Sequence, residues 1–155
     1  MARLPVNPLL GRDLRLSYAS RGGLFEDAEL AVVDRTSRGG RDLALADGVD
    51  NLEQAIADRL KTRRGELSAL GHPGYGSRHH ELIGEPNVER TRNLVKLYVL
   101  QALRDEPRIV EVLSATVRAE HSPPRESVRI EIAVRIVGAH EPLALTLPFS
   151  LESGP

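Results

Sequence analysis

Strict alternation of apolar and polar residues marks the C-terminal third of the chain. The clearest run has its apolar residues at Val128, Ile130, Ile132, Val134 and Ile136, with Arg129, Glu131 and Arg135 between them. The same period of two returns at Leu143, Leu145, Leu147 and Phe149, and earlier at Ile109, Leu113, Ala115 and Val117. Because successive side chains of a strand point to opposite faces, this pattern predicts an antiparallel meander of three strands with one face on helices and one in water. Pro148 has no amide hydrogen, which predicts that the last strand lies at a sheet edge or leaves the sheet there.

A helical period precedes these strands. Val49, Leu52, Ile56 and Leu60 fall on one stripe, which predicts a helix with a single buried face. Asp50 is predicted to cap this helix, with Glu53 reaching back to it in a capping box, and Gly65 is predicted to end it.

A second helix is predicted to begin after Pro86 with Asn87 as its cap and to end before Pro107. Eight of the ten residues 94–103 are apolar. This density predicts a helix buried on most of its circumference at the centre of the core.

The N-terminal part is less regular. Residues 1–10 are predicted to form an extended arm, followed by a short strand through Leu14, Leu16 and Tyr18. Residues 29–34 and 42–46, joined by a glycine-containing connection, predict a hairpin. Residues 71–84 are predicted to form an ordered loop with one helical turn near Glu81. The fold class is therefore α+β, with two main helices packed on an antiparallel sheet that ends in a three-stranded meander, plus an N-terminal hairpin, all in a single domain of residues 1–155.

Composition narrows the function classes. The chain has 155 residues, a net charge of -1, no cysteine and only 3% aromatic residues. A charge near zero gives no field that would attract nucleic acid or an anionic membrane, and the lack of cysteine excludes disulfides and thiol chemistry. No apolar run approaches the roughly 18 residues of a membrane span. We therefore predict a protein that is cytoplasmic when made and that binds neither nucleic acid nor membrane.

No set of residues predicts catalysis. Glu66, Glu81 and Glu106 could be proposed as a carboxylate pair for glycoside hydrolysis, but some pair is always available among 22 acidic residues. His72, His79 and His80 lack the spacing of metal ligands, and as neighbours His79 and His80 are expected to diverge; all three are predicted to be surface or loop histidines. Gly74-Tyr75-Gly76 lacks the lysine of a phosphate-binding loop. The basic residues Arg59, Lys61, Arg63 and Arg64 are predicted to form a solvated helix flank. We predict no catalytic residue, no cofactor and no metal.

Glu106-Pro107-Arg108 follows the second helix. Proline fixes φ, so the two charged residues are held in a fixed relation around a rigid joint. Composition alone favours a plainer interpretation, in which a helix ends, a strand begins and the ion pair is incidental.

Several fragments, taken in order, resemble a known family. They are Gly11-Arg12-Asp13-Leu14, Asn51-Leu52 with Gln54-Ala55-Ile56, Leu60-Lys61-Thr62-Arg63-Arg64-Gly65-Glu66, Tyr75-Gly76 and the stretch from Ala102 through Glu106-Pro107-Arg108 to Ile109. Their order and spacing resemble the sheath-initiator, or baseplate wedge, family of contractile phage tails and related injection systems, which also carries the label of a gene-25-like lysozyme. The segment 21–47 is longer than the usual family pattern.

The resemblance implies a structural baseplate component that templates sheath polymerisation. It implies that Glu106, Pro107 and Arg108 contact a helical core bundle of wedge proteins. It also implies that the region 128–151 accepts sheath strands, with Val128, Ile130, Ile132, Leu145 and Leu147 as candidate docking residues. A chain that is monomeric alone, with six copies in each baseplate ring, follows from the same resemblance. Two alternatives are a peptidoglycan hydrolase and a regulatory protein-binding module.

Overall fold

The computed structural model describes residues 8–21, 24–34, 39–121 and 126–152. The chain divides into two compact units, Met1–Ala55 and Ile56–Pro155. Among the described residues, two α-helices and several antiparallel sheets confirm the predicted α+β class. Most of the predicted N-terminal arm lies outside the described residues, and its last part, Pro8–Leu10, is a short 3-10 helix (η1) instead of an extended segment.

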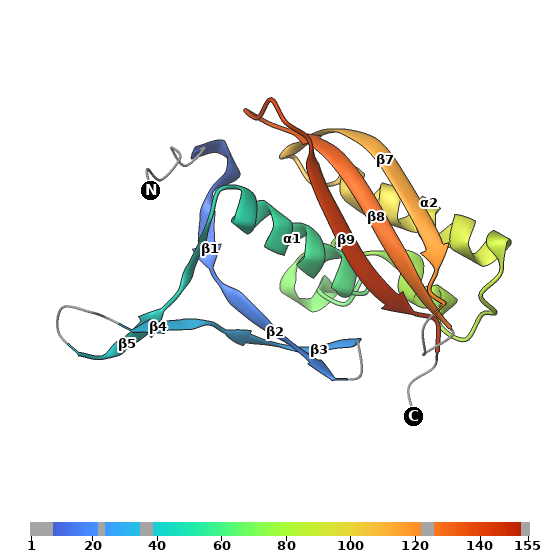
Figure 1. The fold of residues 1–155 in the computed structure, drawn as a ribbon, viewed down its shortest axis with the longest axis horizontal. Helices are drawn as coiled ribbons and strands as arrows, with labels where there is room; N and C mark the ends of the chain where they lie inside the picture. Colours follow the sequence, from blue (N-terminus) through green and yellow to red (C-terminus); the bar gives the residue numbers. More distant parts are fainter. Residues whose placement is uncertain (1–7, 22–23, 35–38, 122–125, 153–155) are drawn as a thin grey trace. The chain divides into compact units, whose positions relative to one another are not determined.

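The described residues of the first unit form three two-stranded ribbons (Figure 1). They pair β1 (Arg12–Leu14) with β6 (Leu45–Asp47), β2 (Leu16–Arg21) with β3 (Leu24–Leu30), and β4 (Val32–Asp34) with β5 (Arg41–Leu43). The ribbons meet at Arg15, Ala31 and Ala44. There the Arg15 amide donates to the Ala44 carbonyl at 2.8 Å, the Ala44 amide to Ala31 at 2.8 Å and the Ala31 amide to Arg15 at 2.9 Å. We call this ring of bonds the three-way junction.

The predicted N-terminal hairpin is present, but only its centre is correct. Residues 32–34 and 41–43 pair as expected, whereas Glu29 and Leu30 pair with β2, and Leu45 and Ala46 pair with β1. The three-way junction causes the difference, because it redirects the chain to a new partner on each side of Ala31 and Ala44.

Helix α1 (Val49–Lys61) differs from its prediction at both ends. Asp50 is the second helical residue and not the cap, and its carboxylate binds the Arg15 guanidinium at 2.7 Å. The helix also ends at Lys61, four positions before Gly65. Leu52, Ile56 and Leu60 of the predicted stripe are buried, but Val49 is 41% exposed.

Two polar side chains of α1 hold the first unit together. The Asn51 amide donates to the Leu10 carbonyl at 2.9 Å in a buried position. The Gln54 side chain accepts from the Leu16 amide at 2.8 Å and donates to the Leu14 carbonyl at 2.9 Å. These residues of the family-like fragment therefore satisfy backbone groups where the chain cannot form a regular ladder.

The second unit is built on the predicted meander of β7 (Ile109–Ala119), β8 (Ser127–Ile136) and β9 (Leu143–Ser150), in the order β7-β8-β9 (Figure 1). Strand β9, which contains Pro148, is an edge strand as predicted. Two 3-10 helices, η2 (Ser68–Leu70) and η3 (Arg78–Leu82), lie in the connection before α2 (Glu89–Arg104), and η3 is the predicted helical turn near Glu81. The alternation along β8 is confirmed, because its five apolar residues are all at most 3% exposed.

Strand β7 breaks the predicted alternation. Its register against β8 shifts between Ile109 and Glu111 and again between Val112 and Ser114. Each shift is a bulge that adds one residue and exchanges the faces. Val112 therefore turns inward, and Leu113 is 47% exposed, contrary to its prediction.

Helix α2 also differs from the prediction. Val88 occupies the cap position, while the side-chain oxygen of Asn87 accepts a hydrogen bond from Arg92 at 2.9 Å. Only one face is buried, formed by Thr91, Val95, Val99, Ala102 and Leu103. Leu97 is 47% exposed, so this helix is not buried on most of its circumference.

Candidate functional site

Glu106 lies at the centre of a buried group of charged and aromatic side chains. It is only 4% exposed, and its carboxylate accepts two hydrogen bonds from the Arg108 guanidinium, at 2.6 and 3.1 Å. A third donor, Nη2 of Arg59, lies 3.7 Å from Oε2. The Arg59 guanidinium in turn stacks 4.5 Å from the centre of the Tyr75 ring. We call Arg59, Tyr75, Glu106 and Arg108 the ionic cluster.

The ionic cluster joins parts of the second unit that are far apart in the sequence. Arg59 comes from the last turns of α1, Tyr75 from the loop before η3, and Glu106 and Arg108 from the joint between α2 and β7. Since one carboxylate forms ion pairs with guanidinium groups from two of these segments, its loss would leave buried positive charge without a partner.

The electrostatics of Glu106 do not suit a general acid. Burial raises the pKa of its carboxyl group, but the hydrogen bonds and charge of Arg108, together with the charge of Arg59, outweigh burial and hold the pKa below its usual range. A glycosidase acid needs the opposite shift, because it must carry a proton near neutral pH. Burial likewise raises the pKa of Tyr75. The Glu106 carboxylate at the centre of the ionic cluster therefore stays ionised.

The end of α1 is tied to the loop that carries Tyr75. The Ser77 amide donates to the Thr62 carbonyl at 2.9 Å, and the Arg64 amide donates to the Ser77 carbonyl at 3.1 Å. Gly76 directly precedes Ser77 and has a φ of 95° that L side chains rarely adopt. These hydrogen bonds place two fragments of the family-like set, residues 60–66 and residues 75–76, next to each other in the fold.

The two adjacent histidines were predicted to be surface or loop residues with diverging side chains, and the structure corrects this. His79 is 3% exposed, and its ring stacks on that of His80 with 4.2 Å between centroids. Nδ1 of His79 lies 2.7 Å from the Ser77 hydroxyl, and Nε2 of His80 lies 2.8 Å from the Leu60 carbonyl. A short 3-10 helix, and not a strand or α-helix, lets neighbouring side chains stack. His72 is exposed as predicted.

His79 provides a test of this arrangement through pH. Burial, and secondarily the neighbouring His80, lower the pKa of His79 from 6.5 to about 3. Between these values the unfolded chain binds a proton that the folded chain does not, so stability is present above pH 6.5 and is lost as the pH falls toward 3. The free energy of unfolding should fall by up to about 1.4 kcal/mol for each pH unit in this range. In urea unfolding at pH 7, 6 and 5, His79→Gln should flatten the dependence of the unfolding free energy on pH. His140→Gln, at an exposed position, should leave this dependence unchanged. Equal slopes in the two variants would contradict the assignment of the pH dependence to His79.

The other predicted site residues are dispersed. Glu66 accepts a hydrogen bond from the Arg63 amide at 3.0 Å, and Glu81 is an exposed partner of Arg78. Pro107 is exposed and Arg108 is partly exposed. Of the predicted docking residues, Val128, Ile130 and Ile132 are buried on the central strand, and Leu145 and Leu147 are half-buried. Within the described ranges, no group of three or more histidine, aspartate or glutamate residues is placed to hold a metal ion.

Arg59 and Tyr75 are the site residues that the sequence analysis missed. Arg59 was predicted to lie on a solvated flank, yet it is 9% exposed. A signal was available, because Leu52, Ile56 and Arg59 follow the i, i+4, i+7 spacing of the buried stripe. An arginine on such a stripe needs a buried acidic partner, and Glu106 supplies it.

A solved structure shares this fold. It is the crystal structure, at 1.44 Å resolution, of a candidate tail lysozyme from Geobacter sulfurreducens, with 26% sequence identity, a TM-score of 0.59, and coverage of 69% of this chain and 94% of that chain. The likeness covers most of both chains and supports the fold described above. The family model of the baseplate wedge protein gp25 matches residues 46–141, more than half of the chain, and the chain belongs to this family.

Family membership confirms the resemblance found in the sequence and gives the protein a structural role in a phage baseplate. The matched range contains all four residues of the ionic cluster. A comparison with curated proteins gave no significant match. Among the described helices, none has the length and apolar character needed to cross a membrane.

Proposed function

We propose that this protein is a non-enzymatic baseplate component that links neighbouring wedge proteins to the sheath and templates sheath polymerisation. In this proposal residues 1–155 act as one sheath-initiator-like domain, monomeric alone and present in six copies per baseplate ring. It assembles in the cytoplasm with wedge proteins and sheath subunits before entering a phage tail or related particle. The observation that carries the proposal is that β9 pairs with β8 on one side and, within the described ranges, with no strand on the other.

The direction of each β9 amide follows from one bond. The Leu151 amide donates to the Glu126 carbonyl on the β8 side at 2.9 Å. Because N–H groups alternate sides along a strand, the odd-numbered residues of β9 face β8, and Ala144, Thr146 and Ser150 direct theirs to the free edge. Pro148 has no N–H. An added strand would therefore find hydrogen-bond donors at Ala144 and Thr146 but none at Pro148.

The other edge of the sheet is less suited to strand addition. The Glu120 amide donates to Ser127, so the outward amides of β7 belong to odd-numbered residues such as Val117 and Ala119. The two bulges interrupt β7 near its start, and bulges protect an edge against pairing. By contrast, β9 pairs with β8 over its whole length without a shift. We therefore assign strand addition to β9, with main-chain bonds supplying affinity.

The wedge contact is assigned to the exposed side of the Glu106-Pro107-Arg108 joint. Glu106 itself is buried, so its part is to hold Arg108 and the joint in position, while Pro107 and the exposed part of Arg108 meet the core bundle. The lowered pKa of Glu106 and the exposed, separate positions of Glu66 and Glu81 support a role without hydrolysis.

Thr146→Pro tests the assignment of the β9 edge. The substitution removes an outward amide at an exposed position and spares the bonds to β8, so the protein should still fold and enter baseplates. Sheath polymerisation on those baseplates should fall by about tenfold or more, as counted by electron microscopy of assembled particles. Thr146→Val keeps the amide and should assemble normally. Ala119→Pro removes an outward amide from β7 and should also assemble normally; normal sheaths on Thr146→Pro baseplates would overturn the assignment.

A further inference from the structure

The side of α2 that faces away from the core carries a seam of defined spacing. Its members, which we call the α2 stripe, are Arg90, Leu94, Leu97, Gln101 and Arg104. Their 4-3-4-3 spacing places all of them on one face of the helix, opposite the buried residues Val95 and Val99. From Arg90 to Arg104 the stripe extends roughly 21 Å along the axis, at about 1.5 Å per residue.

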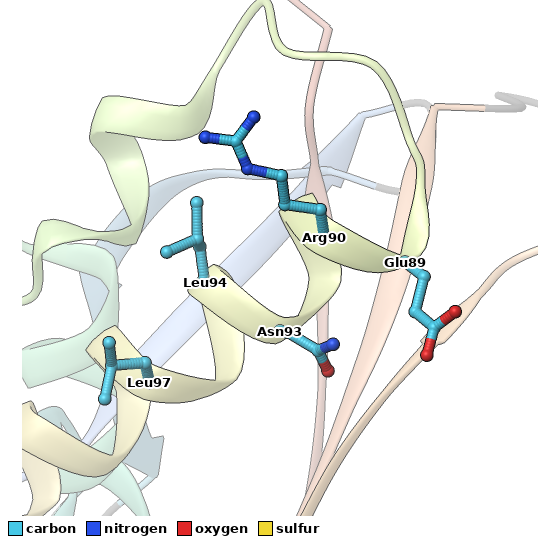
Figure 2. Close-up of a pocket in the computed structure, with 5 residues that line it drawn as sticks. All are labelled: Glu89, Arg90, Asn93, Leu94 and Leu97. Carbon is cyan, nitrogen blue, oxygen red and sulfur yellow. The ribbon is translucent and has the colours of Figure 1, made fainter.

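Leucines form the centre of the α2 stripe. Leu97 is 47% exposed and Leu94 is half-buried, and both line a shallow hollow together with Glu89, Arg90 and Asn93 (Figure 2). Arg90 and Leu94 extend to the same side of the helix in this view (Figure 2). A surface helix with two neighbouring leucines between polar ends has the pattern of a helix-packing seam.

Charge at the ends of the α2 stripe identifies the kind of partner. Among the described residues, neither Arg90 nor Arg104 has an acidic partner. Most arginines elsewhere in the second unit are paired; these are Arg59, Arg64, Arg78, Arg108, Arg118, Arg129 and Arg135. The two cations at the ends of the leucine seam are therefore available to a second molecule.

A second copy of this chain does not fit the α2 stripe. An antiparallel copy would place Arg90 against Arg104, and a parallel copy would place each arginine against itself. Both arrangements bring like charges together at the two ends of a short seam, which opposes association. An amphipathic helix with acidic residues at matching ends satisfies both the leucines and the arginines.

We propose that the α2 stripe binds one amphipathic helix, with apolar residues at its centre and glutamate or aspartate toward both ends. The helix belongs to a neighbouring baseplate component, and only this origin rests on the proposed function. The surface differs from both the β9 edge and the Glu106-Pro107-Arg108 joint, because its contacts come from the exposed face of α2.

A pair of designed helical peptides tests this inference on the full-length protein. Both carry leucines at 4-3-4-3 spacing; one has glutamates at the seam ends and the other has lysines. By fluorescence anisotropy, the acidic peptide should bind about tenfold or more tightly than the basic one. Arg90→Glu with Arg104→Glu should reverse this preference, and Leu97→Glu should abolish binding of both peptides. Arg63→Glu, an exposed charge reversal away from α2, should leave the preference unchanged.

Three results would overturn the inference. They are equal binding of the two peptides, binding that survives Leu97→Glu, and a wild-type dimer in sedimentation that this variant converts to monomer. Circular dichroism checks that each variant folds, and Leu97→Gln provides a milder second substitution. No particle takes part in these measurements, so loss of peptide binding and failure of the Thr146→Pro experiment are separate outcomes.

Discussion

Replacing Glu106 by glutamine is expected to lower the free energy of unfolding by about 3 kcal/mol, because removing one partner of a buried ion pair leaves the other charge uncompensated. Arg59 is 9% exposed, and Glu106 is the acidic group beside it. Glutamine keeps the shape and part of the hydrogen bonding but supplies no negative charge. Urea unfolding at neutral pH gives the change directly.

The matched control is Glu81→Gln. Glu81 also binds an arginine, Arg78, but at an exposed position, where water screens the pair and its contribution to stability is small. A loss at Glu106 no larger than at Glu81 would refute the structural role of the cluster. Exchanging the charges of Glu106 and Arg108 should not restore stability, because an arginine at position 106 would face Arg59.

Gly76→Ala is expected to lower the free energy of unfolding by about 3 kcal/mol or more, because it combines backbone strain with steric overlap. A Cβ at Gly76 would lie 2.6 Å from the Thr62 carbonyl oxygen and 2.8 Å from Arg63 backbone atoms. The Thr62 carbonyl accepts a hydrogen bond from the Ser77 amide and the Arg63 carbonyl from the Glu66 amide, so neither group can rotate away. The variant should unfold at a much lower urea concentration and separate the end of α1 from the Tyr75 loop.

Gly71→Ala separates strain from overlap. Gly71 has a φ of 85°, close to the 95° of Gly76, but a Cβ there would meet nothing within 4 Å. Gly71→Ala should therefore lower the free energy of unfolding only through backbone strain, by about 1 kcal/mol. Equal losses in the two variants would mean that the close approach to Thr62 does not determine the choice of glycine.

Elements with one buried face were predictable from the sequence. The alternation from Val128 to Ile136 located the central strand, and Pro148 indicated an edge, because both signals are local. Leu113 was misplaced because a bulge depends on pairing with β8 and leaves no periodic signal. Leu97 was misplaced because an apolar residue gives the same local sequence signal whether it lies in the core or on an exposed helix face.

Predictions for individual polar residues were wrong where partners distant in the sequence decide the outcome. Asp50 satisfies the local rules for a cap, but Arg15, 35 positions away, binds it inside the helix. Glu106 could be read as an exposed joint until Arg59 is placed beside it. Ion pairs between distant segments leave no pattern in either segment alone, and the burial of His79 likewise depends on Phe149, 4.4 Å away.

The three-way junction closes residues 15–44 into a segment of their own. The chain leaves the junction at Arg15 and re-enters it at Ala44, and the Arg15 amide is 2.8 Å from the Ala44 carbonyl. The ends of the intervening segment are therefore already closed on each other, as in a tolerated domain insertion. The family match starts only at residue 46, just beyond this closure. A segment closed in this way can be exchanged, shortened or extended without altering the register of β1 against β6.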